Sequence, residues 1–384
     1  MKIKAINTVI DLDMSQLPDD MAAQMEREWL ACAELLQTDP PAPHQDATVL
    51  EAKHYGSAAS YTVHRKVTQA AIGAAAGEMV LIHAGAVAND EGLVLGFVAR
   101  SGMGKTTATR TLGQRFAYVT DETLACTPQG RVVAFPKPLS IGNRRAGDQK
   151  YGISPADAGL KALPRKDGHQ VELQLGGIVV LERDEHYRAR PVLEAIDPLE
   201  GVAQVLAQTS SALLLDDPLQ TYARLCARSG GPWVLRYAEI TECLELITEL
   251  FAQLEAHSPA PTWRRLGPGP VQDLTIDDLP QLTDDTEPEP VAAAEPADLT
   301  ATFRRCPWVD AVTGEAGEVL VSVPQRSVLL TELSSFLWEE LDRPLTGEEL
   351  LARAQSRFGA HPQAEEILAL TLGTLAQNQI IEAD

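Results

Sequence analysis

The stretch Ala99-Arg-Ser-Gly-Met-Gly-Lys-Thr106 decides which fold this sequence predicts. It matches the phosphate-binding P-loop pattern, with alanine at the position where the first glycine often stands. The apolar run LVLGFVA (93–99) leads into it, and a helix is expected to follow as far as about Gln114. A glycine-rich surface turn is the alternative interpretation. The strand before the stretch and the helix after it favour the P-loop, because the motif requires that order.

The residue types of this loop suit the phosphates of a nucleotide. Gly102 and Gly104 allow the backbone amides to turn inward around phosphate oxygens. Lys105 supplies a positive charge for the β- and γ-phosphates, and the Thr106 hydroxyl suits Mg²⁺. The sequence therefore predicts ATP and Mg²⁺ as cofactors, held by Ser101, Gly102, Met103, Gly104, Lys105, Thr106 and Thr107.

An acidic residue follows the loop at a short and informative distance. Asp121 lies sixteen residues after Lys105, at the end of the apolar run FAYVT (116–120). One helix of about three turns and one strand fit into that interval, which can bring Asp121 back beside the γ-phosphate. A carboxylate there can accept the proton of an attacking hydroxyl, and the alternative is a turn or cap residue.

Three stretches together resemble the catalytic core of HPr kinase and its relatives, which are related in fold to phosphoenolpyruvate carboxykinase. They are HAGAVANDEGLVLGFVARSGMGKTT (83–107), YVTDE (118–122) and AFPKPLSIG (134–142). The resemblance is specific over about 79–142 and thinner as far as 258. It implies an α/β fold: an α+β, mixed-sheet P-loop kinase core of the HPr kinase type.

The same resemblance assigns roles to three residues. It implies that Asp121 is the base that activates the substrate hydroxyl. Glu122 stands where the family usually has aspartate, and its implied role is to bind Mg²⁺ or the water shell of the ion. His83 is implied to orient Asp121 or to contact phosphate, with a core histidine on a strand as the alternative.

Positive charge is concentrated just after these stretches. Residues 137–168 contain seven basic and three acidic residues, in a chain whose net charge is −22. Lys137 and Arg144 are the candidates that could neutralise the transferring phosphate or hold an acidic substrate. The alternative is a solvated loop that happens to be rich in charge.

The composition divides the chain into three parts. Residues 259–298 contain eight prolines and a run of acidic residues, which is typical of an extended linker. The sequence therefore predicts a catalytic domain at 1–258, a linker at 259–298 and a second domain at 299–384.

Charge and cysteine content limit the partners and the compartment. The net charge of −22 argues against nucleic acid or an anionic membrane as a partner. The most apolar run, 70–88, carries Glu78 and His83 and does not suit a membrane span. The five cysteines form no CxxC pair, which favours a reducing, cytoplasmic location.

The C-terminal domain resembles the PqqD-like peptide-binding modules. The resemblance rests on EVLVSVPQRSVLLTELSSFLWEEL (318–341), which includes Phe336 and Trp338, and on LTGEELLARAQSRFG (345–359). It implies a winged-helix-type domain of three strands and three helices that captures a precursor peptide. Any small winged-helix core would show a similar apolar pattern, and thirteen acidic against six basic residues in 299–384 disfavour DNA binding.

Local patterns predict the remaining elements. Apolar periodicity and turn residues indicate the following: a strand at 2–11, helices at 18–36, 64–77 and 239–255, hairpins at 80–99 and 123–135, a buried strand at 176–183, and C-terminal helices at 331–341, 346–358 and 362–377.

These features predict a kinase that captures its substrate with one domain and modifies it with another. The expected reaction is ATP- and Mg²⁺-dependent phosphorylation of a Ser or Thr hydroxyl of a precursor peptide or small protein, in the biosynthesis of a ribosomally made modified peptide. A kinase of a carrier protein or small metabolite is one alternative, and a non-catalytic, ATP-sensing scaffold of a peptide-modifying complex is another. Homo-oligomerisation is left open.

Overall fold

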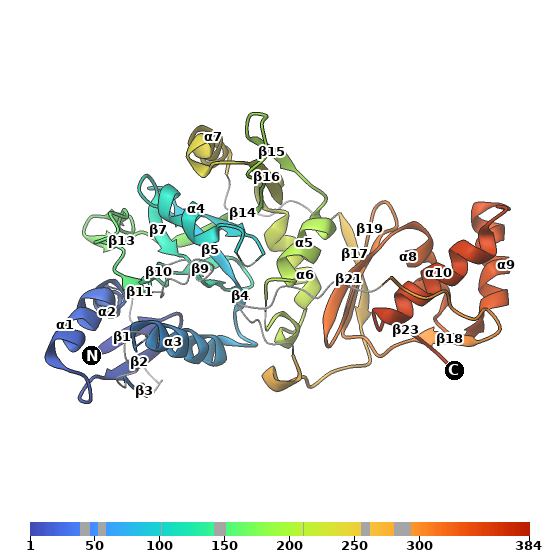
Figure 1. The fold of residues 1–384 in the computed structure, drawn as a ribbon, viewed down its shortest axis with the longest axis horizontal. Helices are drawn as coiled ribbons and strands as arrows, with labels where there is room; N and C mark the ends of the chain where they lie inside the picture. The colour runs from blue at the N-terminus through green and yellow to red at the C-terminus, as the bar shows by residue number, and fades with distance from the viewer. Residues whose placement is uncertain are drawn as a thin grey trace. The chain divides into compact units, whose positions relative to one another are not determined.

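The computed structural model describes residues 1–38, 47–52, 59–100, 102–141, 151–209, 211–254, 262–279 and 293–384. The chain contacts separate into two compact units. The first unit comprises Met1–Leu215 and Arg224–Pro259, and the second comprises Asp216–Ala223 and Ala260–Asp384. Figure 1 traces the chain through both.

The elements of the first unit mix helices and strands throughout. They are β1 (Lys2–Ala5), β2 (Thr8–Asp13), α1 (Asp19–Glu28), α2 (Leu30–Thr38), β3 (Thr48–Glu51), α3 (Ala59–Ala75), β4 (Val80–Ile82), β5 (Ala84–Ala88), β6 (Leu93–Val98), α4 (Lys105–Leu112), β7 (Ala117–Thr120), β8 (Leu124–Cys126), β9 (Arg131–Val133), β10 (Leu139–Ile141), β11 (Tyr151–Ile153), β12 (Arg165–Lys166), β13 (His169–Gln170), β14 (Leu173–Arg183), β15 (Val192–Ala195), α5 (Pro198–Leu206), α6 (Pro218–Cys226), β16 (Trp233–Tyr237) and α7 (Leu244–Gln253). Helix α6 spans the division, because Pro218–Ala223 belong to the second unit and Arg224–Cys226 to the first.

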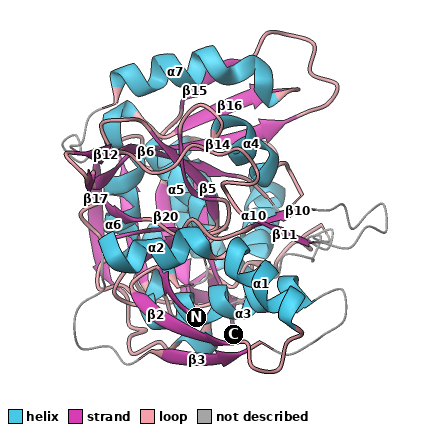
Figure 2. Ribbon diagram, turned by 90° about the vertical axis from the view of Figure 1, so that its left-hand side faces the viewer, coloured by secondary structure: helices cyan, strands magenta, loops and turns pink. Residues whose placement is uncertain are grey.

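A mixed sheet of nine strands is the frame of this unit. Its order is β4-β8-β9-β14-β6-β5-β7, and β16 and β15 extend it beyond β14. Strand β14 runs parallel to β6 and to β16, and β5 runs antiparallel to both β6 and β7. The unit therefore combines a mixed sheet with helices, as the α/β prediction requires. Figure 2 shows helix α7 over strands β16 and β15.

The directions of these strands bring three strand ends together. Because β5 is antiparallel to both of its neighbours, β6 and β7 run the same way. Val98 pairs with Ala84, and Thr120 pairs with Ala86, so β6 and β7 end at nearly the same level. Strand β14 also runs in this direction. The chain segments that leave the three strands therefore begin at one edge of the sheet, where α/β proteins commonly bind ligands.

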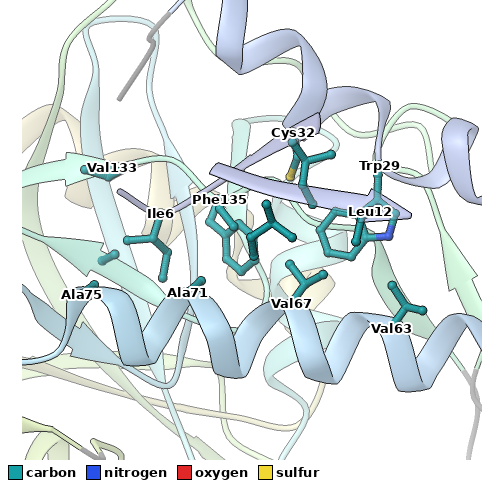
Figure 3. Close-up of a cluster of buried hydrophobic side chains, with 14 of the residues drawn as sticks. Ile6, Leu12, Trp29, Cys32, Val63, Val67, Ala71, Ala75, Val133 and Phe135 are labelled. Atoms are coloured by element: carbon teal, nitrogen blue, oxygen red, sulfur yellow. The ribbon is translucent and has the colours of Figure 1, made fainter. Parts of the chain in front are cut away.

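An N-terminal layer covers part of this sheet. Strands β1, β2 and β3 form their own small sheet, which packs with α1, α2 and α3 into one buried cluster. Helix α3 contributes the stripe Val63, Val67, Ala71 and Ala75, which Figure 3 shows along one side of the helix, with Phe135 in the same cluster. The spacing of four residues places these side chains on one face of the helix.

Two details of this layer differ from the predictions. The single strand expected at 2–11 is a hairpin of β1 and β2, which turns at Ile6 and Asn7. The helix expected at 18–36 is two helices, interrupted at Trp29, whose indole is fully buried. Apolar periodicity indicates a helical segment but does not report a break of one residue.

From Trp263 onward, the described residues of the second unit form two small sheets and three α-helices. Its elements are β17 (Trp263–Pro268), β18 (Thr302–Arg305), β19 (Asp310–Gly314), β20 (Val319–Val323), β21 (Arg326–Leu330), α8 (Glu332–Glu340), β22 (Leu345–Thr346), α9 (Gly347–Phe358), α10 (Ala364–Gln377) and β23 (Ile381–Ala383). The sheets have the orders β17-β19-β20-β21 and β22-β18-β23. The three predicted helices are present, but residues 299–384 form six strands, β18 to β23, instead of the three strands that were expected. Thr346 and Glu349 form a capping box at the start of α9.

Part of the expected linker belongs to this unit. Trp263–Pro268 lies in the segment predicted as a linker, yet it forms β17 and pairs with β19. The Trp263 side chain is buried, and Arg265 Nε donates to Asp310 Oδ1 at 3.2 Å. The strand was not predicted because the composition was averaged over 259–298, which is acidic and rich in proline, whereas Trp263–Leu266 consists of tryptophan, two arginines and leucine.

None of the helices in the described part of the chain combines the length and the apolar character that crossing a bilayer requires.

Candidate active site

The predicted P-loop has the expected context, between β6 and α4. Gly102 and Gly104 adopt φ values of +77° and +90°, which only glycine adopts readily. A Cβ on Gly102 would meet nothing within 4 Å, so there is open space beside the loop backbone. Gly104 is the N-cap of α4. The open loop and the helix N-terminus together fit an anionic phosphate group.

Lys105 is buried at the first position of α4. Its ammonium donates to the carbonyl oxygen of Ala99 at 2.6 Å, so the side chain reaches back across the loop. Thr106 is half-buried, whereas Met103 and Thr107 are exposed. Ser101 and Arg144, which were also predicted as site residues, lie outside the described residues. The described part of the loop thus combines a fixed cation at Lys105 with open space beside the backbone of Gly102.

The packing of α4 on β5 fixes the position of this loop. A Cβ on Gly85 would lie 1.8 Å from the hydroxyl oxygen of Thr109, so only glycine permits this approach. The Thr109 hydroxyl is itself fully buried and donates to the carbonyl oxygen of Lys105 at 2.9 Å. The absent side chain of Gly85 therefore sets how closely the helix that carries Lys105 lies to the sheet.

The predicted acid pair follows β7 directly. Asp121 is buried, and Glu122 is partly exposed. Strand β5 lies between β6, which leads into the P-loop, and β7, which leads into the acid pair. Since β6 and β7 end at nearly the same level, the acid pair begins at the same edge of the sheet as the loop. Sequence spacing predicted this return, and the strand directions account for it.

Lys137 joins the two carboxylates. Its ammonium lies 3.4 Å from Asp121 Oδ1 and 3.4 Å from Glu122 Oε2, and it donates to the carbonyl oxygen of Pro138 at 3.2 Å. The side chain is only 1% exposed. Burial alone would lower the pKa of Lys137, but Asp121 and Glu122 outweigh it and raise that pKa. Lys137 was predicted to meet phosphate or an acidic substrate, whereas in the structure its charge is shared between the two carboxylates.

His83 contacts the second carboxylate from the junction of β4 and β5. Its Nδ1 lies 3.0 Å from the carbonyl oxygen of Glu122 and 3.3 Å from Oε1 of the same residue. Both neighbours are acceptors, so Nδ1 carries the hydrogen. Burial tends to raise the pKa of Glu122, but Lys137 and His83 together hold it well below its ordinary value. Glu122 is therefore an anion, and His83 contacts Glu122 among the described acids rather than Asp121.

Two residues that the sequence reasoning missed also lie in this region. Tyr118 on β7 donates to Asp121 Oδ1 at 3.0 Å and lies 3.1 Å from the carbonyl oxygen of Lys137. Arg183 ends β14, and its Cδ would be 3.6 Å from a Cβ on Gly104. Its guanidinium contacts the Ala238 carbonyl and the exposed Glu239 carboxylate. A polar residue at the end of an apolar strand is the sequence signal that could have found Arg183.

The donors at this edge fit a magnesium–nucleotide complex better than a protein-only metal site. Among the described residues, no group of three or more His, Cys, Asp or Glu side chains could hold a metal ion. The Thr106 hydroxyl and the Glu122 carboxylate are hard oxygen donors of the kind Mg²⁺ prefers. Mg²⁺ commonly binds through one or two protein oxygens together with substrate phosphates, which matches this sparse set.

Comparisons with known proteins give little further guidance. No family model matches the chain, and no curated protein matches its sequence. Among solved structures, the chain is similar to the Hpr(Ser) kinase/phosphatase from Coxiella burnetii, at 12% identity and a TM-score of 0.23. The match covers 45% of this chain and 99% of that one. At this TM-score the likeness carries no argument, so the function is inferred from the residues of the site.

Proposed function

We propose that this chain is an ATP- and Mg²⁺-dependent phosphotransferase that phosphorylates a hydroxyl group. The observation that carries the proposal is an edge of the sheet that two segments share. The P-loop leaves β6 there and the acid pair leaves β7 there, and β5 is the one strand between β6 and β7. Phosphoryl transfer requires a fixed cation, a phosphate cradle and a proton acceptor in one place. Lys105, the loop from Gly102 to Gly104, and Asp121 supply these three.

In this proposal each residue has a defined task. The loop amides and Lys105 bind the β- and γ-phosphates, and Asp121 accepts the proton of the attacking hydroxyl. Thr106 and Glu122 would hold Mg²⁺, which neutralises phosphate charge when it is bound. Lys137 and His83 keep Glu122 ionised. A general base contributes typically about 10²–10⁴-fold to such a rate.

We further propose that the second unit captures the substrate and that the substrate is a peptide with a Ser or Thr hydroxyl. Among the described strands, β17 and β21 each pair with one neighbour and are the two edge strands of their sheet, and we propose β21 as the edge that takes the peptide. An extended peptide can add to an open edge as a further strand. Phe358 at the end of α9, and Ile367 and Leu370 on α10, are exposed apolar side chains that could contact another part of the same peptide. A precursor of a ribosomally made modified peptide fits this use.

Two alternatives remain for the experiment to distinguish. A kinase of a carrier protein or small metabolite would use the same catalytic residues but would not depend on the second unit for substrate affinity. A nucleotide-sensing scaffold would bind ATP without turnover.

Incubation of the full chain with ATP, Mg²⁺ and short Ser- or Thr-containing peptides, read by mass spectrometry, tests the activity. Transfer that is lost in Lys105→Ala supports the proposal, and ATP binding without transfer to any acceptor supports the scaffold.

A pair of surface variants tests capture by the second unit. Leu370→Glu places a charge on the exposed apolar surface of α10, and Leu30→Glu does the same at a comparably exposed leucine of α2. We expect Leu370→Glu to raise KM for a captured peptide with little change in kcat, while Leu30→Glu changes neither. Equal KM values for both variants would favour the metabolite kinase.

A further inference from the structure

The buried carboxylate of Asp121 is held by one of its two oxygens. Tyr118 Oη donates to Oδ1 at 3.0 Å, and the Lys137 ammonium lies 3.4 Å from the same oxygen. Among the described residues, the hydrogen bond to this carboxylate is made to Oδ1 and none is made to Oδ2. The two sides of the carboxylate are therefore chemically different before any substrate arrives.

The two groups that hold Oδ1 come from different elements. Tyr118 lies within β7, three residues before Asp121, while Lys137 follows β9 and is fixed by its own contacts. The Lys137 amide donates to the carbonyl oxygen of Phe135, and its ammonium also donates to Pro138. Two donors on separate segments restrict both the position and the rotation of the carboxylate more than either could alone.

Tyr118 is suited to remain a donor. Burial raises the pKa of Tyr118 well above its ordinary value, and the nearby Asp121 raises it further. The phenol has one hydrogen and two acceptors within reach, Asp121 Oδ1 and the Lys137 carbonyl oxygen. An ionised carboxylate is the stronger acceptor, since hydrogen bonds to charged groups are stronger than those between neutral groups.

We propose that Tyr118 is a positioning residue, which with Lys137 fixes Asp121 through Oδ1 and leaves Oδ2 as the oxygen that accepts the substrate proton. In the transfer step the hydroxyl O–H bond breaks and its proton moves to Oδ2. The oxygen electron pair forms the new bond to the γ-phosphorus, and the bond from that phosphorus to the β–γ bridging oxygen breaks, with ADP as the leaving group. This inference rests on the proposed kinase function.

The effect of losing the Tyr118 hydroxyl follows from this arrangement. Tyr118→Phe removes one oxygen and leaves the ring in its packing against Leu139 and Leu160, so the fold is retained. Loss of a hydrogen bond to a charged group should lower kcat about ten- to a hundredfold. KM values and the nucleotide Kd should change less than about twofold, because Tyr118 touches neither ligand in this scheme. Tyr237→Phe, at a buried tyrosine of β16, is the matched control.

A double-mutant cycle separates positioning of Asp121 from a general structural role. In an Asp121→Asn background, Tyr118→Phe should cause no further loss of kcat, because its effect acts through the carboxylate. An equal loss in both backgrounds, an unchanged kcat in the wild-type background, or a rise in KM instead of a fall in kcat would each overturn the inference.

The proposed kinase activity and the role of Tyr118 can be tested separately. If the wild-type chain shows no transfer that Lys105→Ala abolishes, the proposed function itself fails. If the wild type is active and Asp121→Asn is not, but Tyr118→Phe resembles the wild type, only the assignment of Tyr118 fails.

Discussion

Replacing Lys137 with methionine should destabilise the first unit strongly. The substitution removes a 1%-exposed ammonium that lies 3.4 Å from each of two carboxylates, and methionine keeps a similar apolar volume. Asp121, whose side chain is also almost fully buried, would lose its cation and remain next to the negative Glu122. Removal of one partner from a buried ion pair costs about 3–5 kcal/mol. We therefore expect Lys137→Met to lower the free energy of unfolding by about that amount.

A second lysine provides the control for this prediction. Lys161 forms an ion pair with Asp90 at 2.7 Å, but the two side chains are 41% and 71% exposed. An exposed pair contributes about 0–1 kcal/mol, because water and salt screen it. Urea unfolding of Lys137→Met, Lys161→Met and the wild type, with midpoints converted through a common slope, measures both losses. Equal destabilisation by the two variants would refute the reasoning, because burial would then not determine the strength of the pair.

Three further predictions concern the same region. Asp121→Asn should keep nucleotide binding, since the amide is nearly isosteric, and should lower kcat by about 10²–10⁴-fold; a wild-type kcat would place the base elsewhere. Gly85→Ala should weaken ATP binding in an equilibrium titration, because the new Cβ would collide with Thr109 and push α4 from the sheet, whereas unchanged affinity would show that the helix adapts. Glu122 has a folded pKa below its ordinary 4.5, so the stability it contributes is complete above pH 4.5 and is lost as pH falls below that value. Urea midpoints measured from pH 7 to pH 3 should therefore fall less in Glu122→Gln than in the wild type, and parallel curves would contradict this sign.

The P-loop and the acid pair could be predicted because each has a local sequence signal. Glycines with positive φ, a lysine at the helix start and an acidic residue after an apolar strand are recognisable within about twenty-five residues. The spacing of sixteen between Lys105 and Asp121 was sufficient to predict one helix and one strand between them, and α4 and β7 are present. The antiparallel β5, which brings the two strand ends side by side, was also predicted as part of a hairpin.

The role of Lys137 could not be predicted, because it depends on contacts that sequence spacing does not encode. A lysine in a basic segment is most simply interpreted as an exposed cation, yet here it is buried between two carboxylates that lie fifteen and sixteen residues earlier. Tyr118 and Trp263 were missed for a related reason. A single aromatic residue in an apolar strand, or in an acidic stretch, gives no local indication of which polar group it will meet.

Phe135 links the acid pair to the N-terminal layer formed by β1–β3 and α1–α3. Its ring is fully buried in the cluster that Val67 and Cys32 share, and its carbonyl oxygen accepts the amide hydrogen of Lys137. A protein shortened to begin at residue 79, where the resemblance to a kinase core begins, would expose this ring to solvent and loosen the support of the lysine. The smallest active fragment should therefore retain β1, β2 and α1–α3. Substitutions in that layer should change the rate of transfer more than the affinity for the nucleotide.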